Sequence, residues 1–94
     1  MRKTEALQEL QSIPGVGISI AQDLLALGYR KVSDLRGEDP QAMYDRSCKL
    51  QNAKIDRCLL YVFRCAVYFS REPNPKPELL KWWNWSDRNL AKHG

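Results

Sequence analysis

The sequence predicts a compact all-α fold of four to five helices. Apolar residues recur at helical spacing along most of the chain, strand signals are nearly absent, and glycine or proline interrupts the apolar runs. The chain has 94 residues, of which 44% are hydrophobic and 28% are charged. That balance is globular rather than disordered. The length fits one small domain over residues 1–94.

The apolar spacing places the helices in order along the chain. The first is expected over residues 4–12 and the second over about 18–27. A short turn follows at 33–35, for which Ser33 is the expected cap. The longest helix is expected over about 53–70, and its apolar arc is broad enough for other helices to pack on several sides.

Between the short turn and the longest helix, Asp39 and Pro40 form an N-cap and first-turn pair. We therefore expect a further helix to begin here. Its spacing turns Met43, Tyr44 and Cys48 inward.

We expect the helical core to cover about residues 4–71. Three prolines make residues 73–77 an extended connector. The arm that follows, 78–90, carries all the tryptophans of the chain, which are Trp82, Trp83 and Trp85. So much apolar surface predicts an arm that docks onto the helices.

One stretch carries most of the information: Leu10-x-x-Ile13-Pro14-Gly15-Val16-Gly17-x-x-x-Ala21-x-x-Leu24-Leu25. It resembles the helix-hairpin-helix motif, and its glycines permit a tight turn. In this motif Val16 packs between the two helices and Ala21 lets them approach. The resemblance therefore implies a helix-hairpin-helix core similar to that of SAM domains.

Nucleic-acid-binding members of that superfamily hold a phosphate oxygen on the backbone N–H groups at the start of the second helix. In this chain those groups lie near Gly15, Gly17 and Ser19. The candidate nucleic-acid-binding residues are Pro14, Gly15, Val16, Gly17, Ser19, Arg30, Lys31, Arg57 and Arg64. A hairpin that serves only to pack helices is the alternative. It is favoured by Ile18 and Ile20, which stand where binding members often carry Lys, Arg or Thr.

Many DNA-binding members carry a second hairpin. Here it is expected near residues 48–53, with Lys49 and Gln51 at its glycine positions, and so in a degenerate form. The longest helix also carries a basic-aromatic stripe: Arg57, Tyr61, Arg64, Tyr68 and Arg71. This stripe either follows a phosphate backbone or forms a helix edge covered by the tryptophan arm.

The resemblance extends beyond the hairpin. The matching segments are Ile13 to Gly17, Asp34-Leu35, Asp39-Pro40-x-x-x-Tyr44, Asp56 to Tyr68, and Leu80 to Trp85. Together they resemble the pathogenicity locus helix-hairpin-helix family of small bacterial proteins over roughly residues 7–88. The first half is also similar to the C-terminal domain of TfoX-type competence regulators. The resemblance implies a DNA-related role without a defined biochemical activity.

Neither a catalytic constellation nor a metal site is expected. The spacing of Cys48, Cys58 and Cys65 is too wide for a usual structural zinc site, and His93 is the only histidine. We expect the thiols to act as buried or half-buried apolar groups, and the chain to need no cofactor. The N-terminus lacks a signal peptide and no window would span a membrane, which favours the cytoplasm.

The net charge of +4 suggests an acidic partner. Residues 1–53, which carry the hairpin, hold seven basic and seven acidic residues, whereas 54–94 hold eight against four. The leading hypothesis is a non-enzymatic module that binds the DNA backbone weakly and without sequence preference. The alternative is a protein-interaction module, with a protein partner or a second copy bound through Ile18, Ile20 and the arm.

Overall fold

A computed structural model describes the backbone of residues 3–93 and the side chains of residues 3–90. Over 3–93 it contains five α-helices, three 3-10 helices and no strand, which confirms the all-α fold. The elements are α1 (Lys3–Leu10), α2 (Ile18–Ala26), η1 (Val32–Leu35), α3 (Pro40–Gln51), α4 (Cys58–Arg71), η2 (Pro77–Leu80), η3 (Trp82–Trp85) and α5 (Asp87–His93). Met1, Arg2 and Gly94 lie outside the described residues, as does the side chain of His93.

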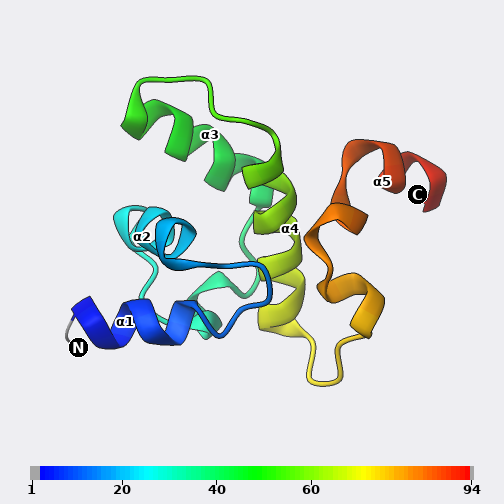
Figure 1. Cartoon of the computed structure of the whole chain (residues 1–94), viewed down its shortest axis with the longest axis horizontal. Helices are drawn as coiled ribbons and strands as arrows, with labels where there is room; N and C mark the ends of the chain where they lie inside the picture. The colour runs from blue at the N-terminus through cyan, green and yellow to red at the C-terminus, as the bar shows by residue number, and fades with distance from the viewer. Residues whose placement is uncertain (1–2, 94) are drawn as a thin grey trace.

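The centre of the molecule is α4, as its broad apolar arc predicted (Figure 1). Helices α1, α2 and α3 lie on one side of it and the C-terminal segment lies on the other. Elements α3, η1, η2 and η3 all contact α4. Nine of its 14 residues are buried, because apolar side chains surround most of its circumference.

Helices α1 and α2 pack against each other and are joined by residues 11–17. The predicted helix over 4–12 ends two residues early, since Gln11 and Ser12 form a turn. The connecting turn buries Ile13 and Val16 while Gly15 adopts a φ of +85°. This conformation is accessible to glycine and costly for residues with a Cβ atom.

The turn over 32–35 is a 3-10 helix, but Ser33 does not cap it. Asp34 performs this role, because its carboxylate accepts hydrogen bonds from the N–H groups of Arg30 at 2.9 Å and Lys31 at 3.0 Å. The predicted start of α3 is confirmed. Asp39 Oδ1 accepts the N–H of Gln41 at 3.0 Å, one residue after Pro40.

The predicted start of the longest helix near Ala53 is wrong, since α4 begins only at Cys58. Helix α3 continues to Gln51 and is terminated by Asn52, which has a left-handed φ of +49°. The segment then runs non-helically to Asp56, whose Oδ1 accepts the N–H of Cys58 at 2.8 Å. The second hairpin expected at 48–53 is therefore misplaced: Lys49 and Gln51 are helical, and the turn lies at 52–57.

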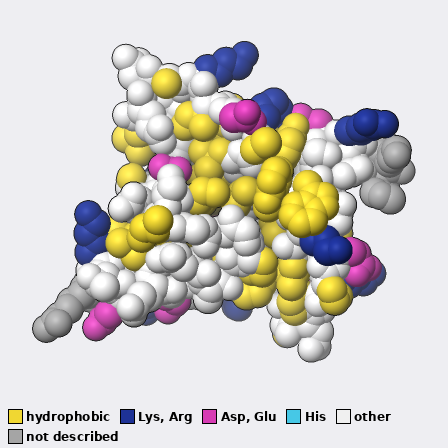
Figure 2. Space-filling model, viewed as in Figure 1, with side chains coloured by type: hydrophobic (Ala, Val, Ile, Leu, Met, Phe, Trp, Pro, Cys, Tyr) yellow, Lys and Arg dark blue, Asp and Glu magenta, His cyan; other side chains and the backbone are white. Residues whose placement is uncertain are grey.

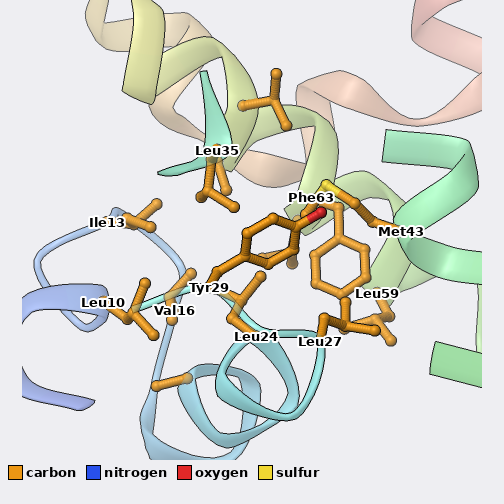
Figure 3. Packing of buried hydrophobic residues seen from close by; sticks show 14 of the residues in the cluster. Leu10, Ile13, Val16, Leu24, Leu27, Tyr29, Leu35, Met43, Leu59 and Phe63 are labelled. Atoms are coloured by element: carbon orange, nitrogen blue, oxygen red, sulfur yellow. The ribbon is translucent and has the colours of Figure 1, made fainter. Parts of the chain in front are cut away.

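The hydrophobic core lies where the hairpin, η1, α3 and α4 meet (Figure 3). The ring of Tyr29 points into the centre of this cluster, toward Phe63. The hydroxyl of Tyr29 lies at the edge of the cluster and donates a hydrogen bond to Glu38 Oε1 at 2.6 Å. Met43 and Tyr44 are buried as predicted, and Cys48 is half-buried against the cluster.

The tryptophan arm docks on α4, as expected. The Trp85 ring lies 5.4 Å from that of Tyr68, and its Nε1 donates to the Leu79 carbonyl at 2.8 Å. Trp82 packs against the core cluster. Trp83 instead remains 52% exposed, so the three tryptophans have different surroundings.

Candidate functional site

The N-terminus of α2 lies at the surface and no side chain within residues 3–90 caps it. Its N-cap residue is Gly17, and Gly17, Ile18 and Ser19 are all exposed. A Cβ atom built on Gly17 would meet no described atom within 4 Å, so the approach to these amides is open. The first N–H groups of a helix have no intrahelical acceptor and carry partial positive charge. This exposed end of α2 is where the sequence places the candidate phosphate-binding amides.

The other hairpin residues have different surroundings. Pro14 is half-buried, and Val16 is 6% exposed with its N–H donated to the Ile13 carbonyl at 3.0 Å. Val16 thus holds the turn together as part of the core. A Cβ atom on Gly15 would lie 3.1 Å from Cδ1 of Trp82, which means that the C-terminal arm packs directly on the turn.

Arg30 and Lys31 are exposed and lie in the segment that leads from α2 to η1. Their backbone is fixed by Asp34, and the next N–H, that of Val32, donates to Glu9 Oε2 at 2.7 Å. This bond places the basic pair beside the C-terminal turn of α1, which leads into the hairpin. The hydrogen bonds from Arg30 and Lys31 lower the pKa of the Asp34 carboxyl.

Arg57 and Arg64 are engaged by the C-terminal segment. Both guanidinium groups contact Asp87, Arg57 at 2.7 Å and Arg64 at 3.0 Å. The Tyr61 hydroxyl also contacts the Asp87 carboxylate, at 3.2 Å. Partial desolvation raises the pKa of this carboxyl, but the hydrogen bonds and charges of Arg64 and Arg57 outweigh that effect, so its pKa is lowered.

The rest of the stripe is also ordered by stacking. The Arg64 guanidinium lies 5.6 Å from the Tyr61 ring centroid, and that of Arg71 lies 5.7 Å from the Tyr68 ring centroid. The cations therefore stack on tyrosines of the same helix, whereas a tryptophan, Trp85, packs on Tyr68.

Sequence reasoning missed Asp87 and the contact of Trp82 with Gly15. Asp87 follows the tryptophans in an unremarkable stretch of polar residues, so its approach to Arg57 depends on the path of the arm over α4. The same holds for Trp82, which is 67 positions from Gly15 along the chain. No local pattern encodes such contacts.

Exposed apolar side chains accompany the hairpin and the arm. Ile18 and Trp83 are each 52% exposed, and Leu50 at the end of α3 is 63% exposed. Ile20 is half-buried against the core instead. In the view of Figure 2, hydrophobic side chains gather over α4 and its neighbours, while Lys and Arg side chains stand apart from one another.

The thiols are less uniformly buried than the sequence suggested. Cys65 is buried and Cys48 half-buried, but Cys58 is exposed because α4 begins only at this residue. Burial raises the pKa of Cys65 to about 11. Over the described part of the chain, His, Cys, Asp and Glu form no group that could hold a metal ion.

Comparison with known proteins places the chain in a family. The model of the family Cdd1, described as "Pathogenicity locus", matches residues 3–91. The chain belongs to the pathogenicity locus family. This result confirms the resemblance drawn from the hairpin, Asp39-Pro40 and the tryptophan segment, while the similarity to competence regulators stays a prediction.

A curated relative of this pathogenicity locus protein is the mitomycin resistance protein McrB of Streptomyces lavendulae. The two are 28% identical over 89 residues, which is 92% of this chain and 81% of the relative. No solved structure matches the chain. Among the described residues of this family member, no helix has the length and apolarity needed to cross a membrane.

Proposed function

We propose that this protein is a non-enzymatic helix-hairpin-helix module that binds DNA weakly and without sequence preference. The observation that carries the proposal is the open, uncapped N-terminus of α2. Backbone amides there would bind a phosphate oxygen, a contact that reads the nucleic-acid backbone and not its bases.

The packing of the first two helices supports the helix-hairpin-helix assignment. Gly15 provides the positive-φ turn, Val16 fills the space beneath it, and Ala21 is fully buried. The small side chain of Ala21 is what close approach of α1 and α2 requires. These are the roles that the motif assigns to these positions.

Electrostatics also favour a phosphate at this end of α2. The first turn of α2 contains no acidic residue, so its partial positive charge is not neutralised locally. Arg30 and Lys31 supply formal charge beside α1. A single anchoring point of this kind predicts weak and salt-dependent binding.

The test is a titration of labelled duplex and single-stranded DNA at about 50 and about 200 mM salt, where binding to the backbone should be weaker at the higher salt concentration. Gly17→Thr is the informative variant, because threonine is accepted at an N-cap and its hydroxyl would occupy the amides. Ser33→Thr, at an exposed position in η1, is the matched control. We expect Gly17→Thr to weaken binding and Ser33→Thr to leave it unchanged. Absence of wild-type binding at the lower salt would overturn the proposal.

The alternative function, a protein-interaction module, is favoured by one observation. Ile18 and Trp83 are both 52% exposed, and apolar side chains of this size are more common at interfaces than on free surfaces. Light scattering after size exclusion tests the case of a second copy. A stable dimer that Ile18→Lys converts into a monomer would support this alternative, and a monomer at all concentrations would exclude self-association.

The name of the relative suggests a biological setting. That protein is described as a mitomycin resistance protein, and we propose that this chain has a related protective role. Expression of the wild-type chain in a mitomycin-sensitive bacterium should raise the survival of the cells when they are exposed to mitomycin. If this role depends on the N-terminus of α2, expression of Gly17→Thr should not raise survival.

A further inference from the structure

Arg57, the N-cap residue of α4, and Arg64 within the helix form an anion site that is occupied by a residue of the same chain. Arg57 donates to Asp87 Oδ2 through Nε at 2.8 Å and lies at 2.7 Å from it through a second nitrogen. Arg64 reaches Oδ1 at 3.0 Å and the Tyr61 hydroxyl donates to Oδ2 at 3.2 Å. Three side chains thus converge on one carboxylate.

Arg57 is the N-cap residue of α4 and has helical backbone angles, so its spacing of four residues to Tyr61 and seven to Arg64 places the three donors on one face. The helix therefore holds the cluster in place without help from the ligand. Arg64 is positioned further by its hydrogen bond to the Trp85 carbonyl at 2.8 Å and by the Tyr61 ring beneath it. Two guanidinium groups and a hydroxyl provide the donors that a tetrahedral phosphate oxyanion accepts.

The contact with Asp87 is exchangeable. The side chains of Asp87 and Arg57 are 47% and 46% exposed, so water and salt weaken their attraction. Asp87 opens α5, a short helix whose main contacts are with η3. The arm itself is anchored independently by Trp82 and Trp85. Movement of Asp87 therefore requires only local opening.

We infer that Arg57, Tyr61 and Arg64 form a second phosphate subsite, which Asp87 masks by acting as a substitute anion. The C-terminal segment then competes with nucleic acid for α4. Within this subsite the Arg64 guanidinium lies over the half-buried ring of Tyr61, and a cation beside an aromatic ring suits a nucleic-acid strand better than a run of carboxylates. The inference rests on the proposed function for its choice of ligand.

The test compares two isosteric substitutions that change net charge equally. Asp87→Asn unmasks the subsite, whereas Asp45→Asn removes an exposed carboxylate on α3 that contacts Gln41. Binding of a fluorescein-labelled oligothymidine is measured by anisotropy at low and moderate salt. Asp87→Asn should bind about fivefold tighter than Asp45→Asn. Its affinity should also fall more steeply with salt concentration, by the amount expected for about one additional phosphate contact.

Adding Arg57→Gln to Asp87→Asn should remove the gain. Equal affinities for Asp87→Asn and Asp45→Asn would overturn the inference, as would a gain that survives Arg57→Gln. An equal gain with labelled polyglutamate would overturn the nucleic-acid assignment. A measurement without substitution guards against misfolding: the Arg57 Nε–Hε resonance of the wild type should shift as oligonucleotide displaces Asp87, and an unchanged resonance at saturation contradicts the model of competition.

The two proposals fail in distinguishable ways. If Gly17→Thr loses binding while Asp87→Asn matches Asp45→Asn, the α2 site stands and the α4 subsite is wrong. If Gly17→Thr binds like the wild type while Asp87→Asn retains its gain, the α4 subsite stands and the α2 site is wrong. No binding by any variant refutes both.

Discussion

At the scale of single residues, Gly15 and Gly17 lie two positions apart in the same turn but are constrained differently. Gly15 has a φ of +85° and Trp82 packs against it. Gly17 has an ordinary extended conformation, with a φ of −90°, and open space around it. The motif needs both glycines, yet only Gly15 is required by the backbone of this chain.

This difference predicts opposite effects of one substitution. Gly15→Ser should destabilise the fold by about 1–2 kcal/mol, because the left-handed conformation disfavours a Cβ atom. Gly17→Ser should be neutral or stabilising by a few tenths of a kcal/mol, since serine is a preferred N-cap. Thermal unfolding followed by circular dichroism measures both. Equal losses at the two positions would contradict this account.

The cysteines offer a second residue-scale prediction. Cys65 is buried with a pKa raised to about 11, so its thiolate is scarce and inaccessible in the folded protein. Cys58 is exposed, although a hydrogen bond to Asp56 raises its pKa. Alkylation of the folded protein should modify Cys58 before Cys65, as followed by mass spectrometry. Asp56→Asn should speed the reaction at Cys58, and early modification of Cys65 would show that its burial is wrong.

At the scale of elements, the boundary between α3 and α4 is the place where local pattern and structure diverge. Apolar spacing continues from Ile55 into α4, which makes the helix look as if it begins before Cys58. The Tyr44 hydroxyl donates to the Ile55 carbonyl, which keeps this group outside any helix while its side chain packs on the core. This tertiary hydrogen bond holds Ile55 in the non-helical segment before α4.

Asn52 provides the test at this boundary, because its φ of +49° terminates α3. Asn52→Gly should retain or slightly raise stability, as glycine is the preferred residue in this conformation. Asn52→Val should cost roughly 1–2 kcal/mol, since a β-branched side chain is strained there. Urea denaturation of the two variants checks the difference. Similar midpoints would mean that α3 does not end at Asn52.

At the scale of the whole molecule, the C-terminal arm connects the two halves that the charge distribution separates. Trp82 packs on the hairpin of the neutral half, while Asp87 binds the arginines of the basic half. The arm therefore packs on the turn before the candidate site at α2 and contacts the arginines of the candidate site at α4.

Global stability should depend on pH through the same carboxylates. The pKa values of Asp34, Asp56 and Asp87 are lowered in the fold, so each contributes stability that is complete above its unfolded pKa and is lost as pH falls through its folded pKa. Burial raises the pKa of Asp23, which acts in the opposite sense. With unfolded values near 4, we expect stability to fall below about pH 4. Denaturant unfolding across pH measures it.

Asp34→Asn tests how much the Asp34 carboxylate contributes to this pH dependence. It should lower stability at neutral pH, because the N–H groups of Arg30 and Lys31 lose a charged acceptor. Its acid-induced loss should be smaller than that of the wild type. A profile parallel to the wild-type profile would exclude Asp34 as a contributor.

The sequence by itself determined the helical class, the turn between the first two helices, the α3 cap and the central place of the longest helix. Each follows from local chemistry: apolar spacing, glycine and proline in turns, and an aspartate N-cap. Only the tertiary structure decided where α4 begins, that Cys58 is exposed, and that Asp87 occupies the arginines. These features depend on contacts between residues far apart in the chain, and spacing along a sequence does not encode the path by which an arm returns to a helix.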